Sequence, residues 1–211
     1  MLRFLLTLIL TIGVNSLSLY SVKTYYEIIM PDIEDNSVNF NVNDDPPPHS
    51  EVAKMARFIV HNSGRNFVIY QSLEPKTNDY PMGAVQSVSD GPVDNSKGTP
   101  YMFVSELEDL DNRCTLTMTL AQTDYCKNKK IDPKFPLCAQ VWLVGRFNRV
   151  KNETEMDFAK DALFSRHPTM KNWPKDHHFF FAKLDIEQIL VQDYFGGPVP
   201  VNVADYYNAS P

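Results

Sequence analysis

The sequence predicts a mainly β protein with peripheral helices, an α+β domain whose short strands form an antiparallel barrel. Three observations predict this class. About six short segments have the pattern of strands, two have the pattern of helices, and they show little of the βαβ alternation typical of parallel sheets. The chain has 211 residues, of which 43% are hydrophobic, so it is long enough for one domain with a substantial core.

The first 18 residues have the layout of a secretory signal peptide. Arg3 precedes an apolar run from Phe4 to Val14, and small residues follow at Ser16 and Ser18. This run is shorter than the roughly 20 residues that a membrane-spanning helix needs, so a membrane anchor is the less favoured interpretation. We therefore expect cleavage after Ser16 or Ser18, and a mature protein that is secreted or lies in an endosomal or lysosomal lumen.

Residues 19–48 are expected to form an extended N-terminal arm. The part from residue 31 to residue 48 is acidic, rich in asparagine and ends in three prolines, a composition that buries little apolar surface. The folded domain is therefore expected to comprise residues 49–211.

A helix is predicted at the start of this domain, followed by three strands. In SEVAKMARFIV the apolar residues recur at helical spacing, and Ser50 is the expected N-cap. The runs NFVIYQSL, MGAVQSVS and YMFVSEL then have the composition of short strands and are separated by turn residues such as Pro75, Asn78 and Gly91.

The second half of the domain carries the clearest strand patterns. CTLTMTLAQT alternates threonine with leucine or methionine, a period of two that predicts a strand. LCAQVWLVGRFNRV predicts another, with a bend or bulge at Gly145. ETEMDFAKDALFSRH predicts a helix that begins near Thr154, with Asp157 in a variant of the capping box, and HHFFFAKLDIEQILVQDYFGG predicts a final strand.

Three of the five histidines lie within SRHPTMKNWPKDHHFFF, between the second helix and the final strand. His177 and His178 are adjacent, so on a strand their side chains point to opposite faces and do not readily share one metal ion. His167 precedes a proline, which favours the end of a helix. A hydrogen-bonded corner is the favoured interpretation, ahead of a flavin or substrate contact and of a metal site.

Charge and motifs exclude several classes of function. The formal net charge of -6 is a poor match for a nucleic-acid backbone, and the one local basic cluster is the short loop CKNKK. The sequence contains no G-x-S-x-G, P-loop or G-x-G-x-x-G motif. We therefore expect no nucleic-acid partner, no catalytic residues and no metal site.

Cysteines and glycosylation motifs fit a lumenal protein. Cys126 and Cys138 bracket the loop KNKKIDPKFPL, and a disulfide that closed this loop would contribute about 3 kcal/mol, which leaves Cys114 as a small buried hydrophobe. Asn152 and Asn208 each begin an N-x-[ST] motif, and we expect glycosylation at both. Pro211 follows the second motif and should lower its occupancy.

Several blocks together give a family resemblance. TLTMTLAQT, CKNKKIDPKFPLC, NETEMDFAK, RHPTMKNWP and FFFAKLDI with DYFGGP occur in an order that resembles the CREG family, secreted cellular repressors of genes stimulated by an adenoviral early protein. The resemblance covers about residues 49–208. It implies the split antiparallel β-barrel of flavin-mononucleotide (FMN)-binding proteins, similar to pyridoxamine-phosphate oxidase.

The resemblance also implies function. Family members are homodimeric glycoproteins that restrain growth, promote differentiation and bind the cation-independent mannose-6-phosphate receptor. Cys126 and Cys138 match the family's disulfide, and Asn152 and Asn208 match family glycosylation positions. Asp185 replaces an asparagine that is glycosylated in relatives, so fewer glycans are available here and receptor binding is the less secure expectation.

FMN binding is expected to be lost. The strand candidates NFVIYQSL, MGAVQSVS and CTLTMTLAQT contain no arginine or lysine, and only Arg113 lies at the edge of the third. Because Arg146 and Arg149 are three residues apart on one strand, they should face opposite sides, so at most one serves a phosphate. The sequence thus predicts a non-enzymatic glycoprotein without a cofactor, whose effect on transcription is indirect; an FMN-dependent oxidoreductase is the alternative.

Overall fold

The structure is a computed structural model that describes residues 45–105 and 110–211. The predicted signal peptide, residues 1–18, and the arm as far as residue 44 lie outside the described residues. In the part of the chain that is described, no helix has the length and apolar character needed to cross a membrane.

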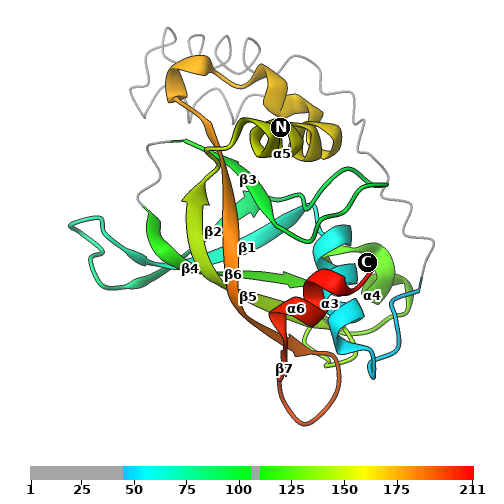
Figure 1. Ribbon diagram of the computed structural model, residues 1–211. Coiled ribbons are helices and arrows are strands. Elements are labelled where there is room, and N and C mark those ends of the chain that lie inside the picture. The colour runs from blue at the N-terminus through cyan, green and yellow to red at the C-terminus, as the bar shows by residue number, and fades with distance from the viewer. Residues whose placement is uncertain (1–44, 106–109) are drawn as a thin grey trace, which may run out of the picture. The chain divides into compact units, whose positions relative to one another are not determined.

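A single antiparallel sheet of seven strands dominates the domain (Figure 1). Six strands follow the order β2-β1-β4-β5-β6-β3, and β7 pairs with β6. The strands are β1 (Arg65–Ser72), β2 (Pro81–Ser87), β3 (Tyr101–Val104), β4 (Leu110–Thr119), β5 (Gln140–Arg149), β6 (Phe180–Gln192) and β7 (Val199–Val201). All predicted strands are present, and β7 was not predicted.

The alternation along β4 and β5 decides which face of the sheet is buried. On β4, Leu116 and Met118 are fully buried and the intervening Thr117 is only half-buried. On β5, Val141 and Leu143 are buried while Trp142 is half-buried. One face of the sheet therefore lies against the core, and the period of two predicted for these strands is confirmed.

The bend predicted at Gly145 is also confirmed. The register between β5 and β6 shifts between Val144 and Gly145, which marks a β-bulge. A side chain at position 145 would collide with the backbone carbonyl of Asp185 on β6, so the close approach of the two strands requires glycine.

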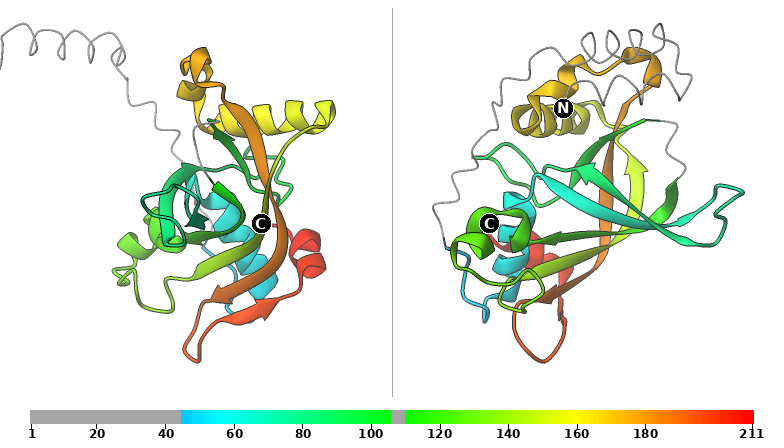
Figure 2. Two further views of the ribbon diagram at one scale, coloured as in Figure 1. Left: turned by 90° about the vertical axis from the view of Figure 1, so that its left-hand side faces the viewer. Right: turned by 180° about the vertical axis from the view of Figure 1, so that it is seen from behind.

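Four α-helices surround the sheet within the described residues: α3 (Val52–Asn62), α4 (Asp124–Asn128), α5 (Glu153–Arg166) and α6 (Val203–Asn208). Short 3-10 turns lie at Leu120–Gln122, Pro168–Asn172 and Lys175–His177. Figure 2 shows α5 at one end of the sheet and α3 with α6 together near the other end. The helices α3 and α5 were predicted, whereas α4 and α6 were not.

Both predicted helix caps were wrong by one or two residues. The N-cap of α3 is Glu51 rather than Ser50, and its side chain makes no capping hydrogen bond. The N-cap of α5 is Asn152 rather than Thr154, and the Asn152 side chain accepts a hydrogen bond from the backbone N–H of Glu155 at 3.0 Å. Asparagine is among the preferred N-cap residues. Asn152 had been considered only as a glycosylation site, and its second role as the N-cap of α5 was missed.

The core has a main cluster between α3 and the sheet and a smaller one beneath α5. Large side chains fully buried in the main cluster include Ile59, Leu116, Leu143, Leu184 and Tyr206. The smaller cluster comprises Tyr101, Val150, Ala159, Ala162, Leu163 and Met170. The loop between β2 and β3 lies next to both clusters, since Val88 belongs to the main cluster and Tyr101 to the smaller one. This loop carries Asp90, the buried carboxylate of the polar network described next.

Candidate functional site

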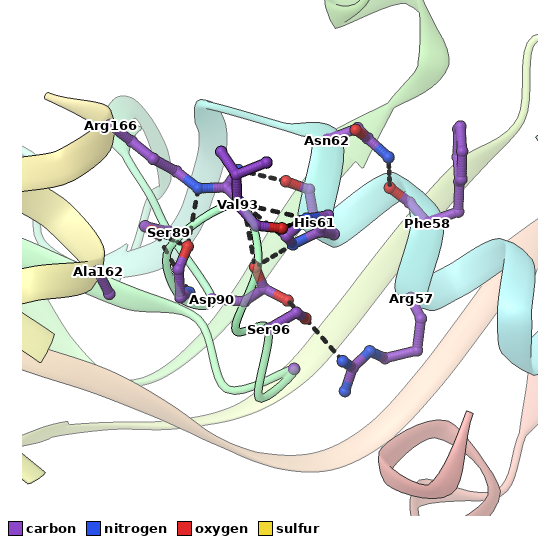
Figure 3. A network of polar contacts seen from close by, with 12 residues as sticks. Arg57, Phe58, His61, Asn62, Ser89, Asp90, Val93, Ser96, Ala162 and Arg166 are labelled. Carbon is purple, nitrogen blue, oxygen red and sulfur yellow. Dashed lines mark hydrogen bonds and ion pairs between the residues drawn. The ribbon is translucent and has the colours of Figure 1, made fainter. Parts of the chain in front are cut away.

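The most concentrated group of buried polar side chains joins α3, the β2–β3 loop and α5 (Figure 3). It comprises Arg57, His61, Asp90, Ser96 and Arg166 and is called the Asp90 network below. The carboxylate of Asp90 is fully buried, with 0% of its side chain exposed, and the side chain of Arg166 is 1% exposed. Asp90 is therefore a charge that must be compensated within the protein.

His61 and Arg166 hold one side of this carboxylate. The Nδ1 atom of His61 lies 2.9 Å from Oδ1 of Asp90, and Nη2 of Arg166 lies 3.7 Å from the same oxygen. Arg166 also donates from Nε to the Gly91 carbonyl at 2.8 Å and from Nη1 to the His61 carbonyl. The His61 Nε2–H donates to the Val93 carbonyl at 3.1 Å, so the imidazole bridges two points of the loop.

Ser96 and Arg57 hold the other side. The Ser96 hydroxyl donates to Oδ2 of Asp90, and Nη2 of Arg57 donates to the Ser96 hydroxyl oxygen at 2.7 Å. Burial by itself would raise the pKa of Asp90, but the hydrogen bond and charge of His61, the Ser96 hydroxyl and the charge of Arg166 together lower this pKa below its usual value. Asp90 is thus a stable carboxylate at neutral pH.

Glycines shape the loop around this carboxylate. Gly98 has φ +77°, and a side chain there would collide with the guanidinium of Arg57. The buried Tyr206 on α6 donates its hydroxyl to the Gly98 carbonyl at 2.7 Å, and its ring lies 5.4 Å from the Arg57 guanidinium carbon. The β2–β3 loop is therefore fastened to α3, α5 and α6 at once.

The order of contacts does not suit nucleophilic catalysis. In a serine hydrolase the hydroxyl donates to an imidazole, which takes its proton, and the carboxylate orients the imidazole. Here Ser96 and His61 both bond to Asp90, one at each oxygen. A hydroxyl that donates to a buried carboxylate is not activated by a base, so the geometry indicates a structural role for the Asp90 network.

The three histidines predicted to form a corner are not brought together. His167 caps the end of α5, and its Nε2–H donates to the Val88 carbonyl at 3.1 Å. Burial and the charge of Arg166 lower the pKa of His167 against the opposing effect of the carbonyl bond. His177 and His178 are exposed, and the His177 ring stacks on Phe179 with centroids 5.9 Å apart.

The described residues contain no group of three or more His, Cys, Asp or Glu side chains that could hold a metal ion. The favoured interpretation of a hydrogen-bonded corner fits His167, whereas His177 and His178 lie on the surface beside it. The later residues of this segment also form an aromatic stack, since Phe103 packs against Trp173 and Phe179 with centroids 5.9 and 5.1 Å apart. This arrangement fixes the turn from α5 into β6.

An open pocket of about 440 Å³ lies on the outer face of the sheet, across β1, β4 and β5. Arg113 of β4 lines this pocket and is paired directly across the sheet with Arg146 of β5, so the two arginines are neighbours. Glu187 lines the pocket and accepts from Nε of Arg146 at 2.9 Å, and Asp79 is a second carboxylate in its lining. Arg149 lies elsewhere, 3.7 Å from the centroid of the Phe180 ring.

The predicted covalent sites lie at exposed or constrained positions. A disulfide joins Cys126 in α4 to Cys138 before β5, with Cα atoms 5.8 Å apart, and Cys114 is buried on β4. Asn152 and Asn208 are both exposed, the first at the start of α5 and the second at the end of α6. Asp185, where the family resemblance leads us to expect an asparagine, accepts a hydrogen bond from Nδ2 of Asn148 at 2.7 Å.

Reasoning from the sequence missed the Asp90 network. Gly91 was predicted only as a turn residue between two strands, and the bond from its backbone N–H to the Ser89 hydroxyl is of the kind found in turns. The partners His61 and Arg166 are 29 and 75–105 residues away from the groups they contact. One signal in the sequence could have pointed to the network. Arg166 follows Ala159, Ala162 and Leu163 at helical spacing, so a charged side chain is expected near the buried side of this helix.

Comparison with known proteins gives a consistent family. A family profile described as "CREG, beta-barrel" matches residues 47–208. The chain is 45% identical to Protein CREG1 of Homo sapiens over 170 residues, which cover 78% of this chain and 77% of that protein. It is 34% identical to Protein CREG2 of Mus musculus over 165 residues, which cover 75% of this chain and 57% of that protein.

Solved structures support the fold. A heme binding protein from Mycobacterium smegmatis superposes with a TM-score of 0.59 at 16% identity, covering 79% of this chain and 62% of that chain. Campylobacter jejuni ChuZ superposes with a TM-score of 0.55 at 11% identity, covering 77% and 65% respectively. The expected split antiparallel barrel is thereby confirmed as the fold.

Proposed function

Because the chain belongs to the CREG family, we propose that it is a secreted or lysosomal glycoprotein that acts through protein partners rather than as an enzyme. Through those partners it restrains growth and promotes differentiation, and any effect on transcription is indirect. Its cellular location, partners and glycans are parts of this proposal, and each has a separate test.

The observation that carries the glycoprotein proposal is the position of Asn152. Asn152 is exposed, and its side-chain oxygen caps α5, which fixes the orientation of the carboxamide. The side-chain nitrogen, to which a glycan would be attached, takes no part in this cap. Asn208 is also exposed, at the end of α6, but Pro211 directly follows its motif and should lower its occupancy. Asn152 is therefore the better acceptor.

The cap and the glycan can be separated by a matched pair of variants. Asn152→Asp keeps an oxygen that caps the helix but removes the amide that accepts a glycan, and Asn152→Ala removes both. We expect wild type from the medium of cultured animal cells to lose mass on treatment with an N-glycosidase and Asn152→Asp to lose less. An unchanged mass for wild type, or protein retained in cells with its leader intact, contradicts the proposal.

A homodimer is the first partner that we propose. The outer face of β1 and β2 exposes Phe67, Ile69 and Val85, and Phe67 is paired directly with Val85 across the two strands. An apolar patch on a two-stranded sheet face is suited to self-association. Light scattering should give twice the monomer mass for wild type and a monomer for Val85→Lys; a monomeric wild type contradicts this proposal.

A mannose-6-phosphate-type receptor is the second proposed partner. Its recognition depends on phosphorylated glycans, so the link runs through Asn152 and Asn208. We expect wild-type protein from culture medium to be retained on immobilised receptor and released by free mannose 6-phosphate. Retention of a variant without either acceptor asparagine shows that the receptor contacts the polypeptide instead.

The alternative function, an FMN-dependent oxidoreductase, is less well supported. Arg113 lines the outer pocket and is paired with Arg146 across β4 and β5, but Glu187, which pairs with Arg146, and Asp79 line the same pocket. Two carboxylates beside a site are unfavourable for a phosphate dianion, so these residues do not fit the phosphate of FMN. We propose that the protein is colourless when purified; a yellow preparation, or stoichiometric binding in a fluorescence titration, supports the alternative.

A further inference from the structure

Apolar side chains are exposed together at the tips of two loops, at the end of the domain away from α5. One loop is closed by the disulfide between Cys126 and Cys138. The other joins β6 to β7, and Figure 2 shows this second loop at the lower end of the molecule. The side chains are Phe135 (42% exposed), Leu137 (40%), Tyr194 (50%), Phe195 (62%) and Val199 (45%). We call these five residues the loop-tip patch.

The two loops are joined to one another. The rings of Phe135 and Phe195 meet edge to face with centroids 5.3 Å apart, and Tyr194 stacks on His49 at 4.8 Å. Cys126–Cys138 constrains the loop that carries Phe135. These contacts make the patch one surface, although each aromatic ring still exposes a large part of its area to water.

Lysines are concentrated on the disulfide-closed segment that carries Phe135. Lys127, Lys129, Lys130 and Lys134 are all exposed within the 13-residue segment that the disulfide closes. Asp132 lies inside the segment and Asp124 just before it, and Nζ of Lys129 lies 3.4 Å from Oδ1 of Asp45. The segment beside the loop-tip patch still carries a local excess of positive charge, whereas the whole chain has a formal net charge of -6.

We propose that the loop-tip patch docks the protein onto the surface of bilayers that carry anionic phospholipid headgroups. Aromatic rings on loop tips enter the boundary between headgroups and acyl chains, and lysines beside them attract the anionic headgroups. The disulfide-closed loop carries both kinds of group, since Phe135 and Leu137 lie on the same segment as the four lysines. This interaction needs no membrane-spanning segment and goes beyond the proposed function.

A second copy of the chain is a weaker candidate for this patch. A symmetric dimer through these tips would bring four lysines of each copy toward the other copy, and like charges oppose such a contact. The outer face of β1 and β2 is apolar without a comparable group of lysines. Charge complementarity therefore favours an anionic lipid surface over self-association at the loop tips.

Vesicle co-sedimentation of the protein purified from culture medium tests the proposal. The probes are vesicles of phosphatidylcholine alone and of phosphatidylcholine with phosphatidylserine in equal parts. We expect binding to the anionic vesicles, reduced by added salt because the lysine contribution is screened. The double variant Phe135→Ser with Phe195→Ser should bind about a hundredfold more weakly, since each ring contributes about tenfold.

Charge is tested separately. The triple variant Lys127→Gln, Lys130→Gln and Lys134→Gln should lose about a hundredfold in partitioning, because each lysine near an anionic surface contributes about fivefold. The matched control is Lys160→Gln, Lys171→Gln and Lys175→Gln, which changes three exposed lysines at the α5 end and should bind as wild type does. Circular dichroism checks that every variant is folded.

Three results overturn the proposal. One is wild-type protein that binds anionic vesicles no better than neutral ones. Another is a folded Phe135→Ser, Phe195→Ser variant that still binds like wild type, and the third is an equal loss from the two lysine triples. If light scattering shows that the Phe135→Ser, Phe195→Ser variant becomes monomeric while wild type is a dimer that ignores vesicles, the patch is a contact between copies instead.

Discussion

Replacement of Asp90 by asparagine is the sharpest test of the role assigned to the Asp90 network. The substitution keeps the size of the side chain and removes only its charge and one acceptor oxygen. Wild-type Asp90 accepts from the Ser96 hydroxyl on one oxygen and lies 2.9 Å from Nδ1 of His61 on the other. An asparagine amide places an N–H against one of these donors, so one contact becomes repulsive.

The expected loss follows from burial. The Asp90 side chain is 0% exposed and that of Arg166 is 1% exposed, so water does not replace the lost charge. Removing one partner of a buried ion pair costs about 3–5 kcal/mol, because the remaining charge stays buried without compensation. We expect the free energy of unfolding of Asp90→Asn to fall by about this amount.

The sign of the pH dependence is fixed by the lowered pKa of Asp90 in the folded protein. Stability from a carboxylate with a lowered pKa is fully present above its unfolded pKa, and it is lost as the pH falls through the folded value. The contribution of the Asp90 charge to the gap between wild type and Asp90→Asn should therefore be lost as the pH falls below about pH 4.

Urea unfolding followed by tryptophan fluorescence, with the disulfide kept oxidised, measures these differences. The matched control is Asp94→Asn, an exposed aspartate of the same loop, which should change the free energy of unfolding by less than about 0.5 kcal/mol. A loss below about 1 kcal/mol for Asp90→Asn at neutral pH would show that the Asp90 network does not stabilise the fold.

Three further predictions concern stability. Gly98→Ala should cost about 1–3 kcal/mol, because it combines a positive φ with a collision against Arg57, and Gly196→Ala, with φ +114° but open space, should cost less; equal costs contradict the collision. Replacing both cysteines of the disulfide by alanine should cost about 3 kcal/mol in thermal or urea unfolding, since the bond closes a separation of 12 residues, and an unchanged midpoint contradicts this. Burial raises the pKa of Asp193 against the opposing charge of His49, and its Oδ2 is buried without a hydrogen-bond partner among the described residues. Asp193→Asn should therefore stabilise by about 1 kcal/mol near neutral pH, and the gain should vanish as the pH falls, because a raised pKa gives stability that is present at low pH and lost as the pH rises; a gain that persists in acid is inconsistent with this cause.

Much of the fold could be predicted because it depends on local pattern. The alternation in CTLTMTLAQT places Leu116 and Met118 on one face whatever their partners are, and it was sufficient for β4. Gly145 was identified as a bulge from its place inside an apolar strand. By contrast, β7 has three residues and α6 has six, and segments this short depend on tertiary contacts such as the buried Tyr206.

The Asp90 network could not be predicted for a different reason. Each member has an ordinary local interpretation: His61 lies near the end of α3, Asp90 lies in a turn and Arg166 is the last residue of α5. Their function in the fold arises only when the chain brings residues from three elements to one carboxylate. The histidine-rich segment is the opposite case: the hydrogen-bonded corner predicted there fits His167, whose ring nitrogen bonds to the Val88 carbonyl, whereas the neighbouring His177 and His178 are exposed.

The Asp90 network and the disulfide stabilise different parts of the domain, so the effects of disrupting each can be measured separately. The Asp90 network fastens the β2–β3 loop to α3, α5 and α6, while the disulfide constrains the loop that carries Phe135 and four lysines. Reduction of the disulfide under native conditions should therefore weaken vesicle binding by releasing the loop-tip patch, without changing the environment of Asp90. Asp90→Asn should do the reverse, lowering global stability while the folded fraction still binds vesicles. If reduction and Asp90→Asn changed vesicle binding in equal measure, the binding would report the amount of folded protein rather than the geometry of the loop tips.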